Sequence, residues 1–278
     1  MEPDADTVKR NVAAALAEDV GSGDVSADLI DEEAHVRARI VTREPGVFCG
    51  QAWAEETCRQ IDRGIRLHWR VDDGARIEND DALVDLEGPA RGLLTAERTV
   101  LNFLQLLSGT ATRTRRFVDA VVGTETVILD TRKTLPGLRV AQKYAVRVGG
   151  GQNHRVGLFD AILLKENHIA AAGGIAAAVC QARGRHPGMP VELEVEDQHE
   201  LADAIAAGVD RILLDNFSID DLRAAVATTA GRVPLEASGG ITLDNVAEVA
   251  RTDVDYISVG ELTKNVTPLD LSMRFHAS

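Results

Sequence analysis

The stretch VELEVEDQHELADAIAAGVDRILLDN, residues 191–216, contains one strand–helix–strand unit. Val191 to Asp197 is rich in β-branched and leucine residues, and Gln198 to Ala207 has the apolar spacing of an amphipathic helix. Gly208 follows as a helix stop, and Arg211 to Asn216 is the next strand-like run. Because a helix joins the two strands, the unit predicts parallel pairing.

The same alternation continues on both sides of this unit, from residue 126 onward. Helical patterns cover Ile219 to Ala230 and Leu243 to Ala250. The remaining strand-like runs are Thr126 to Arg132, Ala161 to Asn167, Pro234 to Gly240 and Asp255 to Leu262. A repeated βα unit predicts an α/β fold with a parallel sheet or barrel.

Polar side chains near the strand ends favour the barrel. Side chains two residues apart share a face of a strand. The sets that share a face are Asp130 with Arg132, Leu163 with Lys165, Glu192 with Glu194 and Glu196, Leu213 with Asp215, and Glu236 with Ser238. Charged and hydroxyl groups gather toward the carboxyl ends, where βα-barrels build their active sites. We therefore expect an incomplete TIM-like barrel with a polar pocket at its mouth.

These polar residues differ in how strongly they indicate function. Burying a whole ring of ionisable groups is costly, so a functional role is favoured for Arg132, Lys165, Glu194 and Asp215. Glu192 and Glu236 have two equal explanations. Each is either part of a buried ion pair with a neighbouring strand or part of the site.

The first part of the chain, residues 1–110, has a different character. A helix-like stretch, VKRNVAAALAEDVGSGDVS, precedes the strand-like runs HVRARIVT and GIRLHWRV, which predicts an N-terminal α/β sandwich domain. A helix from Leu94 to Leu107 and a second from Thr112 to Val122 then lead into the barrel domain, residues 111–267. The C-terminal tail, residues 268–278, is expected to pack back on the first domain.

A cluster of cations lies between Asp130 and Arg155. Six positive side chains face one acid there, although the whole chain of 278 residues carries a formal net charge of -14. The six are Arg132, Lys133, Arg139, Lys143, Arg147 and Arg155. A local charge opposite to that of the molecule indicates a site for an anion rich in carboxylate or phosphate.

The composition limits the other classes of protein. A 45% hydrophobic share argues against disorder, and three separated cysteines form no CxxC pair or disulfide framework. No run approaches the roughly 20 apolar residues of a membrane span, and the N-terminus is too acidic for a secretory signal. We expect a soluble cytoplasmic protein with no nucleic-acid or membrane partner. Scarce lysine on an acidic chain favours a high-salt cytoplasm over an ordinary acidic enzyme.

Several motifs together resemble the quinolinate phosphoribosyltransferase family. They occur in one order over nearly the whole chain: ALAEDVGSGDVS, GVFCG, ERTVLNFLQLLSGTAT, DTRKTLPGLR, QKYAVRVGGGQNHRVGLFDAILLKENH, VELEVED, ILLDN, LEASGGI and VGELT. The resemblance implies transfer of phosphoribosyl from phosphoribosyl pyrophosphate to quinolinate, with loss of carbon dioxide, to give nicotinate mononucleotide for NAD synthesis.

The resemblance also implies a set of quinolinate-binding residues. Arg132, His154, Arg155 and Lys165 fall on the family's diacid-binding positions, and Arg98 on an arginine contributed across a homodimer interface. Without the resemblance, Arg98 would be an exposed helix charge, and His154 could decorate the turn that the glycines before it predict. A hexamer is a further assembly that the sequence leaves open.

Phosphoribosyl pyrophosphate needs other groups. The resemblance implies Lys133 and Lys165 for its pyrophosphate, and Ser238, Gly239, Gly240 and Gly260 for its phosphate. Late loops of a βα-barrel are its usual phosphate cradle. Glu194 and Asp215 are hard oxygen donors suited to Mg2+ near the ribose. Lys133, Glu194 and Asp215 are therefore the expected catalytic residues.

Two positions depart from the family pattern. Lys264 stands where histidine is usual, which puts in doubt the phosphate contacts near it, and Glu196 stands where aspartate is usual, which puts in doubt the reach of its interactions. Three alternatives remain: a nicotinate salvage phosphoribosyltransferase, a paralogue associated with molybdenum transport, and a non-catalytic anion-binding protein. The full set of cations speaks against the paralogue, and Glu194 with Asp215 against the anion-binding protein.

Overall fold

The computed structural model describes residues 3–276, and its contacts divide the chain into two compact units. The first unit contains the described residues of Met1–Arg115, Thr134–Gly150 and Thr263–Ser278. The second contains Arg116–Lys133 and Gly151–Leu262. This grouping differs from the expected division at residues 110 and 267, because residues 134–150 pack with the first unit.

The first unit is built on a four-stranded antiparallel sheet. Its order is β12 (Leu271–His276), β1 (His35–Thr42), β5 (Ala82–Pro89) and β3 (Arg66–Trp69). A two-stranded sheet joins β2 (Gly46–Val47) to β4 (Arg76–Ile77). Strand β12 brings the C-terminal segment onto β1, while the last two residues of the expected tail lie outside the described residues.

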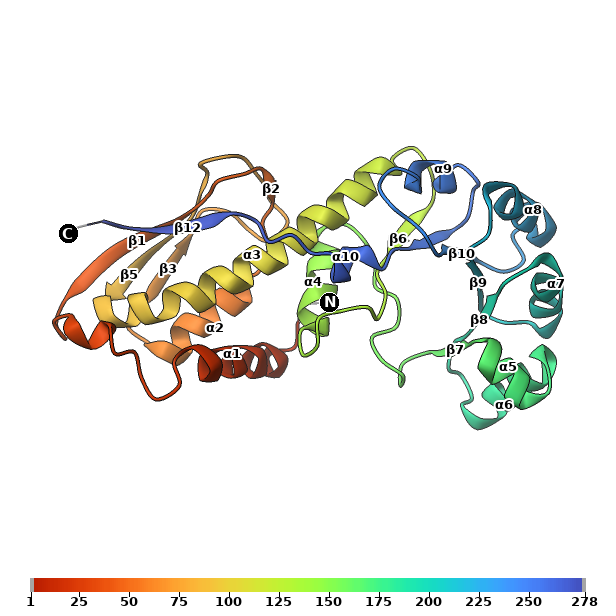
Figure 1. Ribbon diagram of the computed structural model, residues 1–278, viewed down its shortest axis with the longest axis horizontal. Coiled ribbons are helices and arrows are strands. Elements are labelled where there is room, and N and C mark those ends of the chain that lie inside the picture. The colour runs from red at the N-terminus through yellow and green to blue at the C-terminus, as the bar shows by residue number, and fades with distance from the viewer. Residues whose placement is uncertain (1–2, 277–278) are drawn as a thin grey trace. The chain divides into compact units, whose positions relative to one another are not determined.

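Helices cover one side of this sheet, as Figure 1 shows for α1, α2 and α3. Buried Ile40 and Leu86 of the sheet pack with Leu93 and Leu104 of α3 in one core cluster. The helical segments that lie wholly or partly in this unit are α1 (Ala5–Asp19), the 3-10 turn η1 (Ala27–Leu29), α2 (Gln51–Ile61), α3 (Ala90–Ala120), α4 (Arg139–Val148) and α10 (Glu261–Lys264).

Helix α3 is continuous, so the prediction of two helices separated near residues 108–111 is wrong. The polar residues there do not interrupt it, because their hydroxyl groups have partners. Thr110 Oγ1 donates to the Leu106 carbonyl at 3.0 Å, and Thr114 Oγ1 donates to the Thr110 carbonyl at 2.9 Å. Buried Ser108 exchanges hydrogen bonds with the backbone of Cys49.

The second unit contains a six-stranded parallel sheet ordered β6-β11-β10-β9-β8-β7. The first strand pairs with the last, as in a barrel, and within the described residues β6 and β7 are the two edges. The strands are β6 (Val127–Leu129), β7 (Ile162–Leu164), β8 (Val191–Val195), β9 (Arg211–Asp215), β10 (Leu235–Ser238) and β11 (Tyr256–Ser258). The predicted fold class is confirmed.

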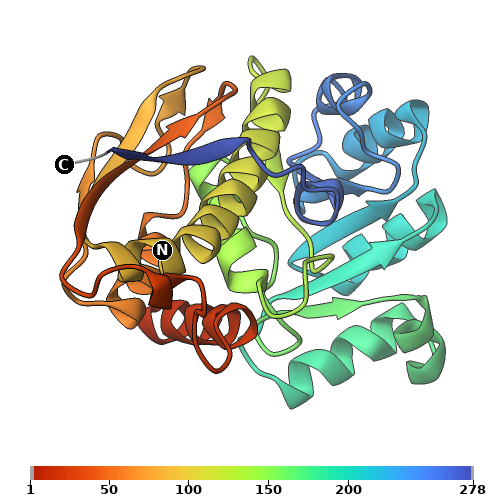
Figure 2. The same cartoon turned by 60° about the vertical axis from the view of Figure 1, so that its left-hand side comes forward.

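Helices follow these strands along the outside of the sheet, which Figure 2 shows from a second direction. They are α5 (Glu166–Ala172), α6 (Ile175–Arg185), α7 (Gln198–Ala207), α8 (Ile219–Thr229) and α9 (Val246–Ala250). In β8, Leu193 and Val195 are fully buried on the side opposite Glu192 and Glu194. The helices therefore pack on the apolar faces of the strands, and the opposite, polar faces can form a site.

Within residues 3–276, we find no helix with the length and apolar character that a membrane crossing requires.

Candidate active site

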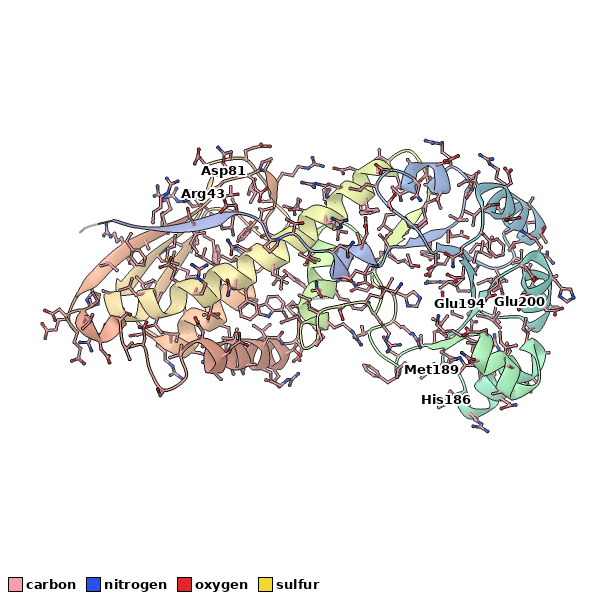
Figure 3. The ribbon with its side chains drawn as sticks, in the orientation of Figure 1. Arg43, Asp81, His186, Met189, Glu194 and Glu200 are labelled. Atoms are coloured by element: carbon pink, nitrogen blue, oxygen red, sulfur yellow. The ribbon has the colours of Figure 1, made fainter. Side chains whose placement is uncertain are left out.

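A cleft of about 520 Å³ opens at the carboxyl ends of the strands of the second unit. Glu194, Asp215 and Ser238 line it from the ends of β8, β9 and β10. The register pairs Asp215 with Ser238 and Glu194 with Leu213, so these side chains project from one face of the sheet. Figure 3 labels Glu194 in this unit, inward of Glu200 on the following helix. Glu196 lies beyond the end of β8 and is exposed.

Four cations line the same cleft from loops. Arg132 and Lys133 follow β6, Arg155 follows a short bridge at the β6 edge, and Lys165 follows β7. The expectation that Asp130 and Arg132 share a strand face is wrong, because β6 ends at Leu129. The turn after this strand lets Arg132 and Lys133 reach the same space.

The other cations of the predicted cluster belong to the first unit. Arg139, Lys143 and Arg147 lie on helix α4, where Lys143 is buried. Sequence analysis did not predict this helix. Of the six cations, Arg132, Lys133 and Arg155 line the cleft of the second unit.

Two guanidinium groups stand near one another in the cleft. Burial and the neighbouring charge of Arg132 lower the pKa of Arg155. Because like charges repel, a bound dianion would relieve the cost of holding them together. Arg155 is also held by its own loop, since its Nη1 donates to the Ala161 carbonyl at 3.2 Å.

Lys165 and Glu194 form an ion pair across neighbouring strands. Their Nζ and Oε2 atoms are 2.5 Å apart, with 43% of the lysine side chain and 12% of the glutamate side chain exposed. The lysine therefore keeps a solvent-facing side that a ligand can reach. Glu194 is held in one position by the ammonium group.

His154 lies deeper, and only 9% of its side chain is exposed. Its Nε2 is 2.8 Å from Glu192 Oε2 and 3.7 Å from Glu236 Oε2. Burial lowers the pKa of His154, but the hydrogen bond and charge of Glu192, with the charge of Glu236, outweigh burial and raise it. On the other side of the ring, the Arg155 backbone N–H donates to Nδ1 at 2.8 Å.

Glu192 and Glu236 are two buried carboxyl groups that interact. Burial and the charge of Glu192 raise the pKa of Glu236 to about 7. Burial also opposes ionisation of Glu192, but the hydrogen bond and charge of His154 win and lower its pKa. Near neutral pH, Glu192 is therefore ionised and Glu236 carries part of a proton.

The ligand atoms of His154, Glu192 and Glu236 lie within 4.8 Å of one another, a spacing that could hold a metal ion. Arg211 Nη1, however, is 3.1 Å from Glu236 Oε2 and already provides that carboxyl group with a cation. Another positive charge at this place would meet the arginine. We treat the three residues as a hydrogen-bonded cluster.

Asp130 anchors the loop that carries His154. Its Oδ1 accepts from the His154 backbone N–H at 2.9 Å, and its Oδ2 accepts from Asn153 Nδ2 at 2.6 Å. The Asp130 side chain is fully buried. Sequence analysis noted this residue as the single acid in a basic stretch and as sharing a strand face with Arg132, so its anchoring role was missed.

A tight loop follows β10 at Gly239 and Gly240, which line the cleft together with Ser238, the last residue of the strand. Gly239 has φ +95°, and a Cβ atom there would overlap Asn216 Oδ1. Only glycine suits this backbone, which can approach a ligand closely. Asn216, which also lines the cleft, was not predicted as a site residue.

Two predicted residues are not among those that line the cleft. Gly260 follows β11, and a Cβ there would stand 3.0 Å from Lys133 Cδ, so this glycine leaves room for the lysine stem. Arg98 is exposed on helix α3 in the first unit. Its predicted role across a dimer interface stays a prediction.

Comparison with known families covers almost the whole chain. The model for "Quinolinate phosphoribosyl transferase, N-terminal domain" matches residues 24–108, and the model for the C-terminal domain matches residues 110–274. The chain belongs to the quinolinate phosphoribosyltransferase family. The resemblance seen in the motifs is confirmed.

Similar members of the quinolinate phosphoribosyltransferase family match over most of their length. The nicotinate-nucleotide pyrophosphorylase [carboxylating] of Mycobacterium leprae is 45% identical, over 96% of this chain and 95% of its own. The probable enzyme of Bacillus subtilis is 44% identical, over 92% and 89%. The solved structure of the Francisella tularensis nicotinate-nucleotide pyrophosphorylase has a TM-score of 0.97 and 46% identity, covering 99% and 98% of the two chains.

Proposed function

We propose that this protein joins quinolinate to phosphoribosyl pyrophosphate and releases pyrophosphate and carbon dioxide, giving nicotinate mononucleotide for NAD synthesis. The observation that carries the proposal is the match of both family domains along the chain. The cleft supports it, because four cations line it beside the carboxylates of Glu194 and Asp215, and such a site suits two polyanionic substrates.

The quinolinate end of the cleft is formed by Arg132, Arg155 and Lys165. Guanidinium groups present forked donors that match a carboxylate, so two arginines suit a pyridine 2,3-dicarboxylate. Lys165 adds a point charge that is already oriented by Glu194. His154 lies deeper in the cleft than these three side chains. Arg98 of a second subunit completes the quinolinate site.

The phosphoribosyl pyrophosphate end is formed by Lys133 and the loops after the late strands. Lys133 and Lys165 face the pyrophosphate. Backbone N–H groups of Ser238, Gly239 and Gly240, together with Gly260, suit the 5'-phosphate.

Glu194 and Asp215 fit a Mg2+ ion that accompanies the pyrophosphate. They stand on adjacent strands, both line the cleft, and carboxylate oxygens are the ligands that Mg2+ prefers. When bound, the ion would neutralise the charge that develops on the departing pyrophosphate. The same two carboxylates would stabilise the cation-like anomeric carbon.

The first step needs no general base. The pyridine nitrogen has a lone pair that attacks the anomeric carbon as the bond to pyrophosphate breaks. Holding the two substrates in line is therefore the main task of the arginine and lysine side chains.

Ribosylation makes the ring nitrogen positive, so the ring accepts the electron pair of the breaking C2–carboxylate bond. Carbon dioxide leaves, and the C2 carbanion takes up a proton. Lys133 and a bound water are the two proton sources compatible with the cleft.

The alternatives differ in their products. A nicotinate salvage enzyme would use the monoacid and release no carbon dioxide, and an anion-binding protein would release neither product. A transport-associated paralogue would have altered substrate clamps, whereas Arg132, Arg155 and Lys165 converge here.

The proposal includes a homodimer, in the cytoplasm, that shares Arg98 between subunits. A hexamer would be an assembly of such dimers. The acidic, lysine-poor composition supports a high-salt cytoplasm.

The test is an assay of the purified protein with quinolinate, phosphoribosyl pyrophosphate and Mg2+, following both products together. We expect pyrophosphate and carbon dioxide in equal amounts and no turnover after Mg2+ is chelated. Carbon dioxide without pyrophosphate, or turnover of nicotinate in place of quinolinate, would reject the proposal.

A further inference from the structure

Gln142 on helix α4 is fully buried and bonds to two segments that are far apart in the sequence. Its Oε1 accepts the Leu135 backbone N–H, and its Nε2 donates to the Thr263 carbonyl, both at 2.8 Å. A backbone N–H can only donate and a carbonyl can only accept, so a side chain that serves both needs an acceptor and a donor together. The glutamine amide supplies both without placing a charge in the interior.

The two partners of Gln142 lie beside points where the chain passes between the two units. The chain leaves the second unit after Lys133 and reaches Leu135 two residues later. It leaves that unit again after Leu262, directly before Thr263. One amide therefore ties together two connections that the sequence keeps far apart.

Helix α4, which carries this amide, is itself held firmly in the first unit. Ala141 belongs to the buried cluster that contains Trp53. The Tyr144 hydroxyl donates to Asp73 Oδ2 at 2.7 Å, and its ring packs beside that of Trp53 with the centroids 5.6 Å apart. Gln142 therefore stands on a fixed base.

Lys133 lies against both of the connections that Gln142 joins. A Cβ atom built on Gly260 would stand 3.0 Å from Lys133 Cδ and 3.7 Å from Lys133 Nζ, so the lysine side chain runs over this glycine. Gly260 comes shortly before Thr263, and Lys133 comes shortly before Leu135. The backbone of the lysine and the surface under its side chain are thus both held through Gln142.

We propose that Gln142 is a positioning residue for Lys133: it fixes the two segments between which the lysine side chain lies, and so directs the ammonium group toward the pyrophosphate of phosphoribosyl pyrophosphate. The inference rests on the proposed function. A flexible lysine loses conformational entropy when it binds an anion, and a side chain that is held beforehand loses less. Arg155 and Lys165 stand on loops other than the two that Gln142 joins, so quinolinate binding should change less.

A double-mutant cycle with Lys133 tests the proposal. Gln142→Met keeps the length of the side chain and removes both hydrogen bonds. At saturating quinolinate, we expect it to raise the KM for phosphoribosyl pyrophosphate by about tenfold, while the KM for quinolinate stays within about threefold of wild type. In a Lys133→Ala background, the same change should lower kcat/KM by no more than about twofold, because the group that it positions is already gone.

The matched control is Gln181→Met, which changes an exposed glutamine of helix α6 in the same way and should behave as wild type. Where Lys133→Ala leaves too little turnover to compare, calorimetric affinity for pyrophosphate with Mg2+ replaces kcat/KM, and the same pattern is expected. Circular dichroism and thermal unfolding check that each variant is folded. If Gln142→Met does not fold, Gln142→Asn replaces it, because its amide is one methylene too short to keep both partners.

Two results would overturn the inference. Equal rises in the KM values of both substrates, or a full further loss when Gln142→Met is added to Lys133→Ala, would mean that Gln142 supports the fold and does not act through the lysine. An unchanged Gln142→Met variant beside an active wild-type enzyme would reject the inference alone. A wild-type protein that does not turn over quinolinate would reject the proposed function and this inference together.

Discussion

Lys165 and Glu194 form an ion pair that leaves both side chains at the cleft. The ammonium group lies 2.5 Å from the carboxylate, yet 43% of the lysine side chain is exposed toward the cleft. The ammonium group thereby fixes the position of the Glu194 carboxylate. The lysine retains donors for an anion.

Removing a cation from the cleft should abolish turnover without unfolding the protein. For Arg132→Ala and Lys165→Ala we expect kcat/KM to fall by about a hundredfold to ten-thousandfold, because each removes a charge from the proposed diacid site. Thermal unfolding should change little. Exposed Arg185→Ala on helix α6 is the control. A wild-type rate in either variant would remove that residue from the site.

Glu236 should make stability depend on pH. Its pKa is about 7 in the folded protein, against an ordinary value of 4.5. Its favourable contribution is therefore complete below about pH 4.5 and is lost as the pH rises through about 7. His154, with a raised pKa, acts in the same direction, whereas Glu192, with a lowered pKa, contributes above its ordinary range.

Glu236→Gln replaces the buried carboxyl group by a neutral amide of the same shape. Between pH 6 and 8.5 we expect the free energy of urea unfolding of wild type to fall by on the order of 1–3 kcal/mol, and that of the variant to fall by less. Parallel curves for the two proteins would show that Glu236 does not titrate in this range.

At the residue scale, the sequence predicts which side chains reach the cleft where residue type and spacing alone determine their positions. Glu194 and Asp215 fall at strand ends with period two, and the structure places them in one cleft. His154 is different, because its partners Glu192 and Asp130 come from other elements. Which side of its ring faces the protein depends on tertiary contacts that no local pattern encodes.

At the level of the elements, helix α3 packs closely against the backbone of Thr267 at Gly109. A Cβ at Gly109 would overlap the Thr267 carbonyl oxygen. Gly109→Ala should therefore destabilise the protein by about 2–4 kcal/mol, measured by urea unfolding. Gly184 in α6 has nothing within 4 Å of a built Cβ. Gly184→Ala should be neutral or stabilise by about 0.5 kcal/mol. Equal effects of the two changes would contradict the packing of α3.

The strands of the second unit were predictable because each is a short apolar run between helical patterns. All six observed strands fall inside the predicted runs, although each is shorter. The helix α4 was not predicted, because its arginines and lysine resembled a binding loop. Its buried side includes Gln142, which bonds to the Leu135 N–H and the Thr263 carbonyl, so long-range contacts stabilise it.

At the scale of the whole molecule, strand order matters more than any single motif. The first strand of the second unit pairs with the last, so loops distant in sequence meet at one mouth. Arg132, Arg155 and Asp215 come together in this way. The sequence predicted the repeat of strand and helix. The grouping of residues 134–150 with the first unit depends on contacts such as that of Tyr144 with Asp73, far apart in the chain.

Sharing of Arg98 between subunits can be tested with a mixed dimer. Arg98→Ala and Arg132→Ala protomers, given different tags and co-expressed, are purified as a pair. If Arg98 completes the partner's cleft, one site lacks both arginines and the other lacks neither, so activity should be about half that of a wild-type pair purified in the same way. If each protomer uses its own Arg98, both sites are damaged and the pair is as inactive as either single variant. Failure to recover any paired protomers would contradict the dimer itself.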